Sequence, residues 1–223
     1  LSSSSAASDV YKRQALAVAA KILVFVLLVA SYDLLLGYTG IVSFAHTMFF
    51  GIGAYSVAIA CSRLGPSWMS IGIGLVGSVA ASLALALLIG LFSLRVRAIF
   101  FAMLTLAVAS AFQTLASQLS EWTGGEDGLS FRTPEVLSAA AHWRDTPLQG
   151  LGFTVQADGR LLAYWGLFAI VCVAFLLLLR IVNSPFGRVL QAIRENPFRA
   201  EAIGYQTVIY RTLSVVISAL FAT

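Results

Sequence analysis

The sequence predicts an all-α protein, a polytopic bundle of transmembrane helices with about five complete spans and one truncated span. Of the 223 residues, 59% are hydrophobic and only 11% are charged, whereas soluble domains carry roughly 25% charged residues. Several apolar runs also reach the length of about 20 residues that a helix needs to cross a hydrocarbon core about 30 Å thick. Composition and run length together indicate an integral membrane protein.

The apolar runs define the predicted spans in chain order. They are residues 15–36, 41–60, 68–92, 98–119 and 163–182, followed by an incomplete run from Val208. The chain stops at Thr223 inside that last run, without a cap or a stop signal. Such an ending is typical of an interrupted helix, and we therefore expect a fragment that is truncated at both ends.

The first fourteen residues, LSSSSAASDVYKRQ, do not fit the pattern of the spans. They are polar and rich in serine, and they lack the charged-then-apolar order of a signal peptide. We therefore expect residues 1–14 to be a non-native, adaptor-derived leader. Residues 15–223 would then form the transmembrane domain fragment.

The charge pattern predicts the orientation in the membrane. Lys and Arg number 14 against 10 Asp and Glu, but no basic stripe with interleaved aromatic residues is present, so nucleic acid is not an expected partner. Arginines instead crowd into residues 183–206 and occur at Arg95 and Arg97. Because basic residues near helix ends favour the cytoplasm, we place these segments inside and the acidic segment 120–162 on the extracytoplasmic side.

The inside segment carries two helix-start signals. Ser184 before Pro185, and Asn196 before Pro197, each predict an N-cap followed by proline at the first helical position. Gly204 offers a left-handed stop. Between these signals, one apolar stripe is predicted for the first helix, formed by Phe186, Val189, Leu190 and Ile193. The pair either lies on lipid as interfacial helices or docks a soluble partner through apolar anchors and a charged rim.

The stretch NSPFGRVLQAIRENPFRAEAIGY resembles the cytoplasmic coupling loop of ABC-importer permeases. Glu201, Ala202 and Gly204 match the Glu-Ala-Ala motif and its following glycine, while Ile203 replaces the second alanine. Together with DLLLGYTGIVSFAHTMFFGIGAY, FFAMLTLAVA and WTGGEDGL, in this order, it resembles the LivM-type permease of branched-chain amino-acid ABC transporters. The similarity extends from Asp33 to the end of the chain.

This resemblance implies an ABC-importer permease in the bacterial inner membrane that imports amino acids. The implied partners are ABC ATPase subunits, a second related permease subunit and a periplasmic substrate-binding protein. Residues 183–206 would be the coupling loop, with the ATPase contacted through Arg194, Glu195, Asn196, Arg199, Glu201, Ala202 and Gly204. ATP would bind to the partner, because neither Lys12 nor Lys21 lies in a phosphate-binding glycine loop. We therefore expect no enzymatic site and no bound cofactor in this chain.

The membrane segment GYTGIVSFAHTMFFGIGAY combines four glycines with a histidine. Glycines let helices approach closely, and a polar ring is costly in hydrocarbon. The candidates for the pathway or for helix packing are Gly37, Gly40, His46, Gly51 and Gly53. A purely structural hydrogen bond from His46 between helices is the main alternative.

Other site chemistries find less support. Ser43 and His46 lie three residues apart, but the elbow that activates a serine nucleophile is missing, so no catalytic residue is expected. Cys61 and Cys172 are far apart, which favours neither a disulfide nor a metal site. An ion-coupled secondary amino-acid carrier stays open as a second function, with Asp33 or His46 as its relay.

Overall fold

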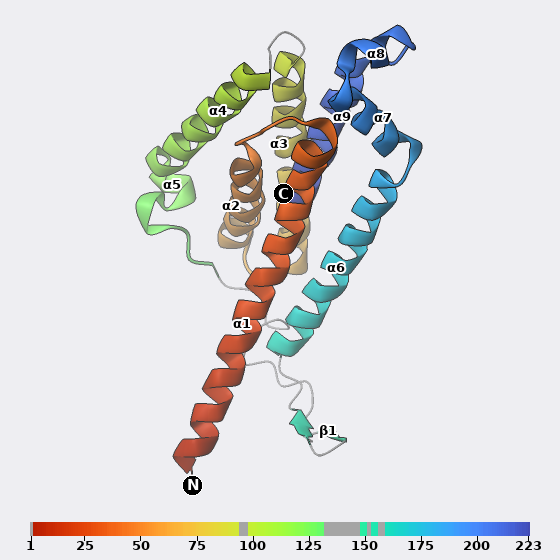
Figure 1. Cartoon of the computed structure of the whole chain (residues 1–223). Coiled ribbons are helices and arrows are strands. Elements are labelled where there is room, and N and C mark those ends of the chain that lie inside the picture. The colour runs from red at the N-terminus through yellow and green to blue at the C-terminus, as the bar shows by residue number, and fades with distance from the viewer. Residues whose placement is uncertain (1, 94–97, 132–147, 151–152, 156–158) are drawn as a thin grey trace.

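The computed structural model describes the chain except for residues 1, 94–97, 132–147, 151–152 and 156–158. The side chains of residues 1–13 also lie outside the description. The predicted leader falls in this region, and so do Arg95 and Arg97. What remains is a bundle of long helices with two short helices at one end (Figure 1).

The described elements follow one another without large insertions. They are α1 (Ser2–Asp33), the π-helix η1 (Leu34–Thr39), α2 (His46–Leu64), α3 (Trp68–Ser93), α4 (Ala98–Gln118), α5 (Ser120–Thr123), the 3-10 helix η2 (Gly125–Asp127), β1 (Leu148–Gly150), β2 (Phe153–Val155), α6 (Gly159–Val182), α7 (Pro185–Glu195), α8 (Pro197–Ala202) and α9 (Thr207–Ala222).

The five predicted complete spans are confirmed. Five described stretches are long and apolar enough to cross a membrane: Gln14–Thr39, His46–Leu64, Trp68–Phe92, Phe100–Gln118 and Leu161–Val182. The predicted incomplete span is α9, an apolar helix of 16 residues. Large apolar side chains lie exposed on α3 and α6, as the lipid-facing sides of a multi-pass membrane protein require, among them Ile73, Val76, Leu87, Ile170, Val173 and Leu176.

Two helix starts differ from the prediction. Helix α1 begins at Ser2 rather than residue 15, because residues 2–14 contain neither proline nor glycine to interrupt it. The second span begins at His46 rather than residue 41. Gly40 has a left-handed backbone (φ 69°) that ends η1, and the Phe44 N–H donates to Thr105 Oγ1 of α4 at 3.1 Å instead of to a helical carbonyl.

A small hairpin is the exception to the all-α prediction. Strands β1 and β2 pair antiparallel, with Leu148 opposite Val155 and Gly150 opposite Phe153. The hairpin belongs to the segment 120–162. It lies beyond the start of α6, at the end of that helix remote from α7 and α8 (Figure 1), which agrees with the expectation that these segments occupy opposite sides of the membrane.

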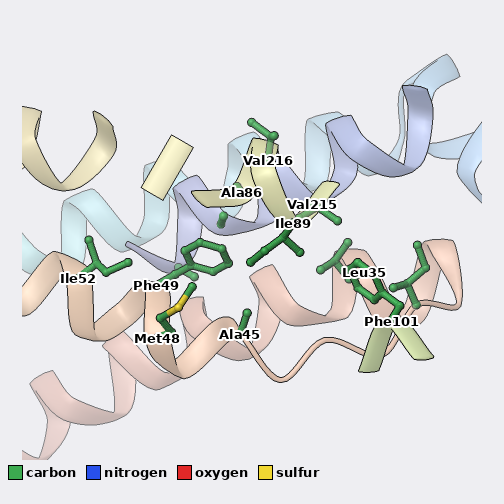
Figure 2. Packing of buried hydrophobic residues seen from close by; sticks show 13 residues of the cluster. Leu35, Ala45, Met48, Phe49, Ile52, Ala86, Ile89, Phe101, Val215 and Val216 are labelled. Atoms are coloured by element: carbon green, nitrogen blue, oxygen red, sulfur yellow. The ribbon is translucent and has the colours of Figure 1, made fainter. Parts of the chain in front are cut away.

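The core forms where α2, α3 and α9 meet. Figure 2 shows side chains from these helices interdigitating: Met48, Phe49, Ile52, Ala86, Ile89, Val215 and Val216, with Leu35 and Phe101 nearby. Glycines allow the helices to approach. A Cβ at Gly74 would lie 2.7 Å from the Val57 Cα, and one at Gly90 would lie 2.6 Å from Thr212 Cγ2. Close backbone approach of this kind is how membrane helices gain van der Waals contact.

Candidate functional site

The predicted cytoplasmic helix pair is present as α7 and α8 (Figure 1). Pro185 begins α7 and Pro197 begins α8, as their sequence signals predicted. The Asn196 Oδ1 accepts a hydrogen bond from the Arg199 N–H at 3.0 Å and so caps α8. Ser184 occupies its predicted position but caps differently. Its hydroxyl donates to the Ile181 carbonyl at 2.6 Å, at the end of α6, and makes no cap bond to α7.

The apolar stripe of α7 faces the protein itself. Val189, Leu190 and Ile193 are buried, and they pack against residues of η1, α6 and α9, including Leu34, Leu178 and Tyr210. The ring of Phe186 stacks on that of Tyr210 with centroids 5.6 Å apart. The expectation that this stripe anchors a soluble partner or lipid is therefore wrong. Its burial instead fixes α7 to the membrane helices.

Gly204 ends α8 in a Schellman motif, the paired hydrogen bonds that close many helix C-termini. The Tyr205 N–H donates to the Ala200 carbonyl at 3.1 Å, and the Gly204 N–H donates to the Glu201 carbonyl at 2.9 Å. Gly204 has φ +95°, and a Cβ there would meet nothing within 4 Å. Glycine is therefore favoured by backbone conformation and not by crowding.

The α8 tip, which we define as Phe198, Arg199, Ala202 and Ile203, projects from the bundle. Phe198 is 80% exposed and Ile203 is 68% exposed, and the other two are also exposed. Beside the tip, Glu201 Oε1 accepts a hydrogen bond from Thr207 Oγ1 at 2.5 Å, which ties α8 to the first residue of α9. Sequence reasoning missed Phe198 as a surface anchor, although it lies outside the α7 stripe.

Arg194 connects α7 to the end of the first span. Its Nη1 donates to the Gly37 carbonyl of η1, and a Cβ at Gly40 would lie 3.1 Å from the Arg194 Cγ. Gly37 itself lies against Asp33, whose exposed carboxylate would be 2.5 Å from an added Cβ. The two glycines therefore shape the turn that receives Arg194. Glu195, by contrast, is exposed.

The backbone between η1 and α2 is a non-helical break inside the bundle. Ile41, Ser43 and Ala45 are buried there, and non-helical backbone at membrane depth is tolerated where protein covers it. The Ser43 Oγ accepts a hydrogen bond from the Ala45 N–H at 3.3 Å. Ser43 is thus engaged with its own loop and does not form a nucleophile–base pair with His46.

His46 is the first residue of α2 and is only 6% exposed. Its Nε2 lies 2.7 Å from the Ser218 Oγ of α9, and the same serine hydroxyl donates to the Ser31 carbonyl of α1. The Tyr32 ring meets the imidazole edge-on, with centroids 5.0 Å apart. His46 therefore joins three helices, as the structural alternative requires. Ser218 and Ser31 were not foreseen, because isolated serines in apolar helices carry no distinctive pattern.

His46 also lines a cavity of about 950 Å³ between α1, α2 and α4. Its walls comprise Leu28, Val29, Tyr32, Ser43, Phe44, His46, Thr47, Met48, Tyr55, Leu106, Ala109, Ser110, Phe112, Gln113, Thr114, Ala116, Ser117 and Gly125. The two remaining candidate glycines serve helix contacts near it. A Cβ at Gly51 would lie 3.3 Å from the Phe112 Cε1, and Gly53 packs on the backbone of Thr223.

The chemistry of the described residues is that of binding and packing. Among them, no group of three or more His, Cys, Asp or Glu side chains could hold a metal ion. The described walls of the cavity carry hydroxyl, amide and imidazole groups but no charged side chain. The arrangement suits a neutral or zwitterionic solute, and the α8 tip suits a macromolecular partner.

Comparison with known proteins agrees with this architecture. The family described as "Branched-chain amino acid transport system / permease component" matches residues 14–223. The "High-affinity branched-chain amino acid transport system permease protein LivM" of Salmonella typhimurium is 25% identical over 213 residues, which cover 92% of this chain and 49% of that protein. The protein of the same name from Escherichia coli is 24% identical over 210 residues, covering 90% and 48%.

The chain thus spans about half the length of the curated relatives it matches. No solved structure matches it. The family match covers nearly the whole chain, including all five apolar spans and the α7–α8 pair. The chain belongs to the family of permease components of branched-chain amino acid transport systems.

Proposed function

We propose that the chain is the membrane-spanning permease subunit of an ATP-driven importer for branched-chain amino acids. It forms part of the translocation pathway and couples that pathway to a cytoplasmic ATPase, which supplies the ATP-binding site. Family membership supports the transport role. The names of the Salmonella and Escherichia coli relatives support the substrate class.

The assembly we propose contains further subunits in the bacterial inner membrane. A second related permease completes the pathway, ABC ATPase subunits dock at the α7–α8 end, and a periplasmic binding protein delivers the amino acid at the opposite end. The exposed apolar faces of α3 and α6 provide surface for the second permease and for the lipid bilayer.

The α8 tip carries the proposal of ATPase docking. Phe198 and Ile203 are exposed large apolar side chains with charged Arg199 between them in sequence. Apolar anchors with a charged rim are how grooves in soluble partners recognise short helices. The buried stripe of α7 keeps this tip in a fixed position relative to the spans. A partner that binds the tip can therefore exert force on the membrane helices.

The test is co-purification of the complete tagged protein with the ATPase subunit encoded beside it, in mild detergent. We expect Phe198→Asp to lose most of the ATPase, because a central apolar anchor contributes about 2 kcal/mol or more to such interfaces. Phe131→Asp is the matched control, since Phe131 is 43% exposed but belongs to the segment 120–162. Equal recovery with both variants would reject the α8 tip as the docking site. Failure of the native protein to retain any ATPase would reject the importer.

The alternative, an ion-coupled secondary carrier, needs a titratable relay in the pathway. Asp33 is exposed near the end of α1, and the described walls of the cavity contain no carboxylate. His46 is held by Ser218. No observation therefore favours this alternative. Uptake of L-leucine into proteoliposomes that contain no ATPase, driven by an ion gradient alone, would establish it.

A further inference from the structure

The hydrogen bonds around His46 determine which of its ring nitrogens carries a proton. Ser31 contributes a carbonyl oxygen, which can only accept, so the Ser218 hydroxyl must donate its single proton there. Ser218 therefore cannot donate to His46, and the His46 Nε2 must be the donor in their 2.7 Å contact. In the neutral ring, the other nitrogen, Nδ1, is then an acceptor.

The His46 Nδ1 is buried and has no hydrogen-bond partner among the described residues. Buried polar atoms are seldom left without a partner, and each exception calls for an explanation. His46 itself is 6% exposed and forms part of the cavity wall. An acceptor in such a place awaits a donor, which can be water or an N–H group of a solute.

The start of α2 supplies complementary groups at the same place. The first N–H groups of a helix have no partner within that helix, and the helix dipole favours a negative charge beside them. Helix α2 begins directly at His46, after the buried break, and residues 46–48 contribute to the cavity wall. Membrane transporters bind the carboxylate of their substrates at the ends of discontinuous helices in this way.

We propose that the break before α2 is a binding site for an α-amino-acid zwitterion, in which the His46 Nδ1 accepts a hydrogen bond from the ammonium group and the N–H groups at the start of α2 face the carboxylate. The proposal rests on the proposed transport function and names the part of the pathway that recognises the amino-acid headgroup. The volume of about 950 Å³ falls within the range of roughly 300–1,000 Å³ for ligand pockets.

The cavity walls support a zwitterion with an apolar side chain. No described wall residue is charged, so a solute with net charge would leave that charge uncompensated. Apolar side chains from two helices, Leu28, Val29, Leu106 and Phe112, are available for the rest of the solute. This site would recognise the headgroup common to amino acids and would leave selection among apolar side chains to shape.

The test measures occupancy directly in the complete protein. Cys61 and Cys172, the free cysteines of the described chain, are replaced by serine, and Ser110→Cys places a thiol on the exposed α4 wall of the cavity. Alkylation of that thiol by a small maleimide is timed with L-leucine, with 4-methylpentanoate, which lacks the ammonium group, and with 3-methylbutylamine, which lacks the carboxylate. We expect only L-leucine to slow the reaction strongly.

Two His46 variants separate headgroup recognition from helix packing. His46→Asn can keep an acceptor near the position of Nδ1, whereas His46→Gln can keep the contact with Ser218 and loses that acceptor. We expect the leucine concentration for half-protection to rise roughly 10- to 100-fold in His46→Gln, as for a lost hydrogen bond to a charged group, and to rise less in His46→Asn. Gel filtration verifies that both variants fold.

Three results would overturn the site: equal protection by 4-methylpentanoate, full protection by L-leucine in His46→Gln, or no protection by L-leucine in the native background. The proposed function fails separately, through loss of ATPase co-purification. A protein that retains its ATPase but shows none of the expected protection would remain an importer permease whose substrate site lies elsewhere.

Discussion

Replacement of Gly204 tests whether the geometry at the end of α8 controls ATPase docking. Gly204 has φ +95°, and an added Cβ would meet nothing within 4 Å. The whole cost of Gly204→Ala therefore comes from the left-handed backbone, which disfavours L-residues by roughly 1–2 kcal/mol. A change of that size shifts an equilibrium by a factor of about 5–30. If docking requires the formed Schellman motif, the Kd of the ATPase should rise by up to this factor.

The assay is titration of the ATPase subunit onto the complete permease in lipid nanodiscs. Gly204→Asn should weaken binding less than Gly204→Ala, because asparagine adopts the left-handed conformation more readily. Gly72→Ala on α3 is the matched control. A Cβ at Gly72 also meets nothing within 4 Å, but its φ is not left-handed. An unchanged Kd for Gly204→Ala, or equal effects of Gly204→Ala and Gly72→Ala, would refute the reasoning.

Two further predictions concern the contacts of α7 and α8. Arg194→Ala removes the donor to the Gly37 carbonyl; we expect the ATPase to bind normally while more ATP is hydrolysed per leucine imported, and Arg188→Ala, also exposed on α7, is the control. An unchanged ATP-to-leucine ratio would contradict this. Glu201→Ala should lower the free energy of unfolding by about 1 kcal/mol, because it removes the acceptor for Thr207, whereas Glu201→Gln keeps an acceptor oxygen. Thermal unfolding of the purified protein measures both, and additivity with Thr207→Val would show that the two side chains are not coupled.

The sequence predicted the spans and the α7–α8 pair because their signals are local. Apolar length is sufficient for a span, and Asn196 with Pro197 is sufficient to start a helix. Periodicity also showed that α7 has an apolar face, but it could not show what covers that face. The covering residues, such as Leu34 and Tyr210, come from distant parts of the chain.

The break before α2 escaped prediction for a related reason. Its residues are apolar, so hydropathy alone continues the span from residue 41. Its non-helical backbone depends on Gly40 and on Thr105, which accepts a hydrogen bond from Phe44 across 61 positions of sequence. The sequence singled out His46 as a polar group that needs a partner. The partner itself, Ser218, lies 172 positions away and became visible only in the folded chain.

The contacts around η1 place the α8 tip and the cavity in one mechanical unit. Helix α7 is held against α6 and α9 by its buried stripe, and Arg194 holds the carbonyl of Gly37. From Gly37 only the end of the π-helix and the buried break separate this contact from His46. A π-helical turn is a frequent site of functional rearrangement, because its hydrogen-bond register differs from that of the adjoining α-helix. Movement of α7 can therefore alter the break without unfolding α1, and the side chain at the cavity wall would move with it. This argument requires Arg194 to affect coupling and not docking, which is the distinction that the ATP-to-leucine ratio measures.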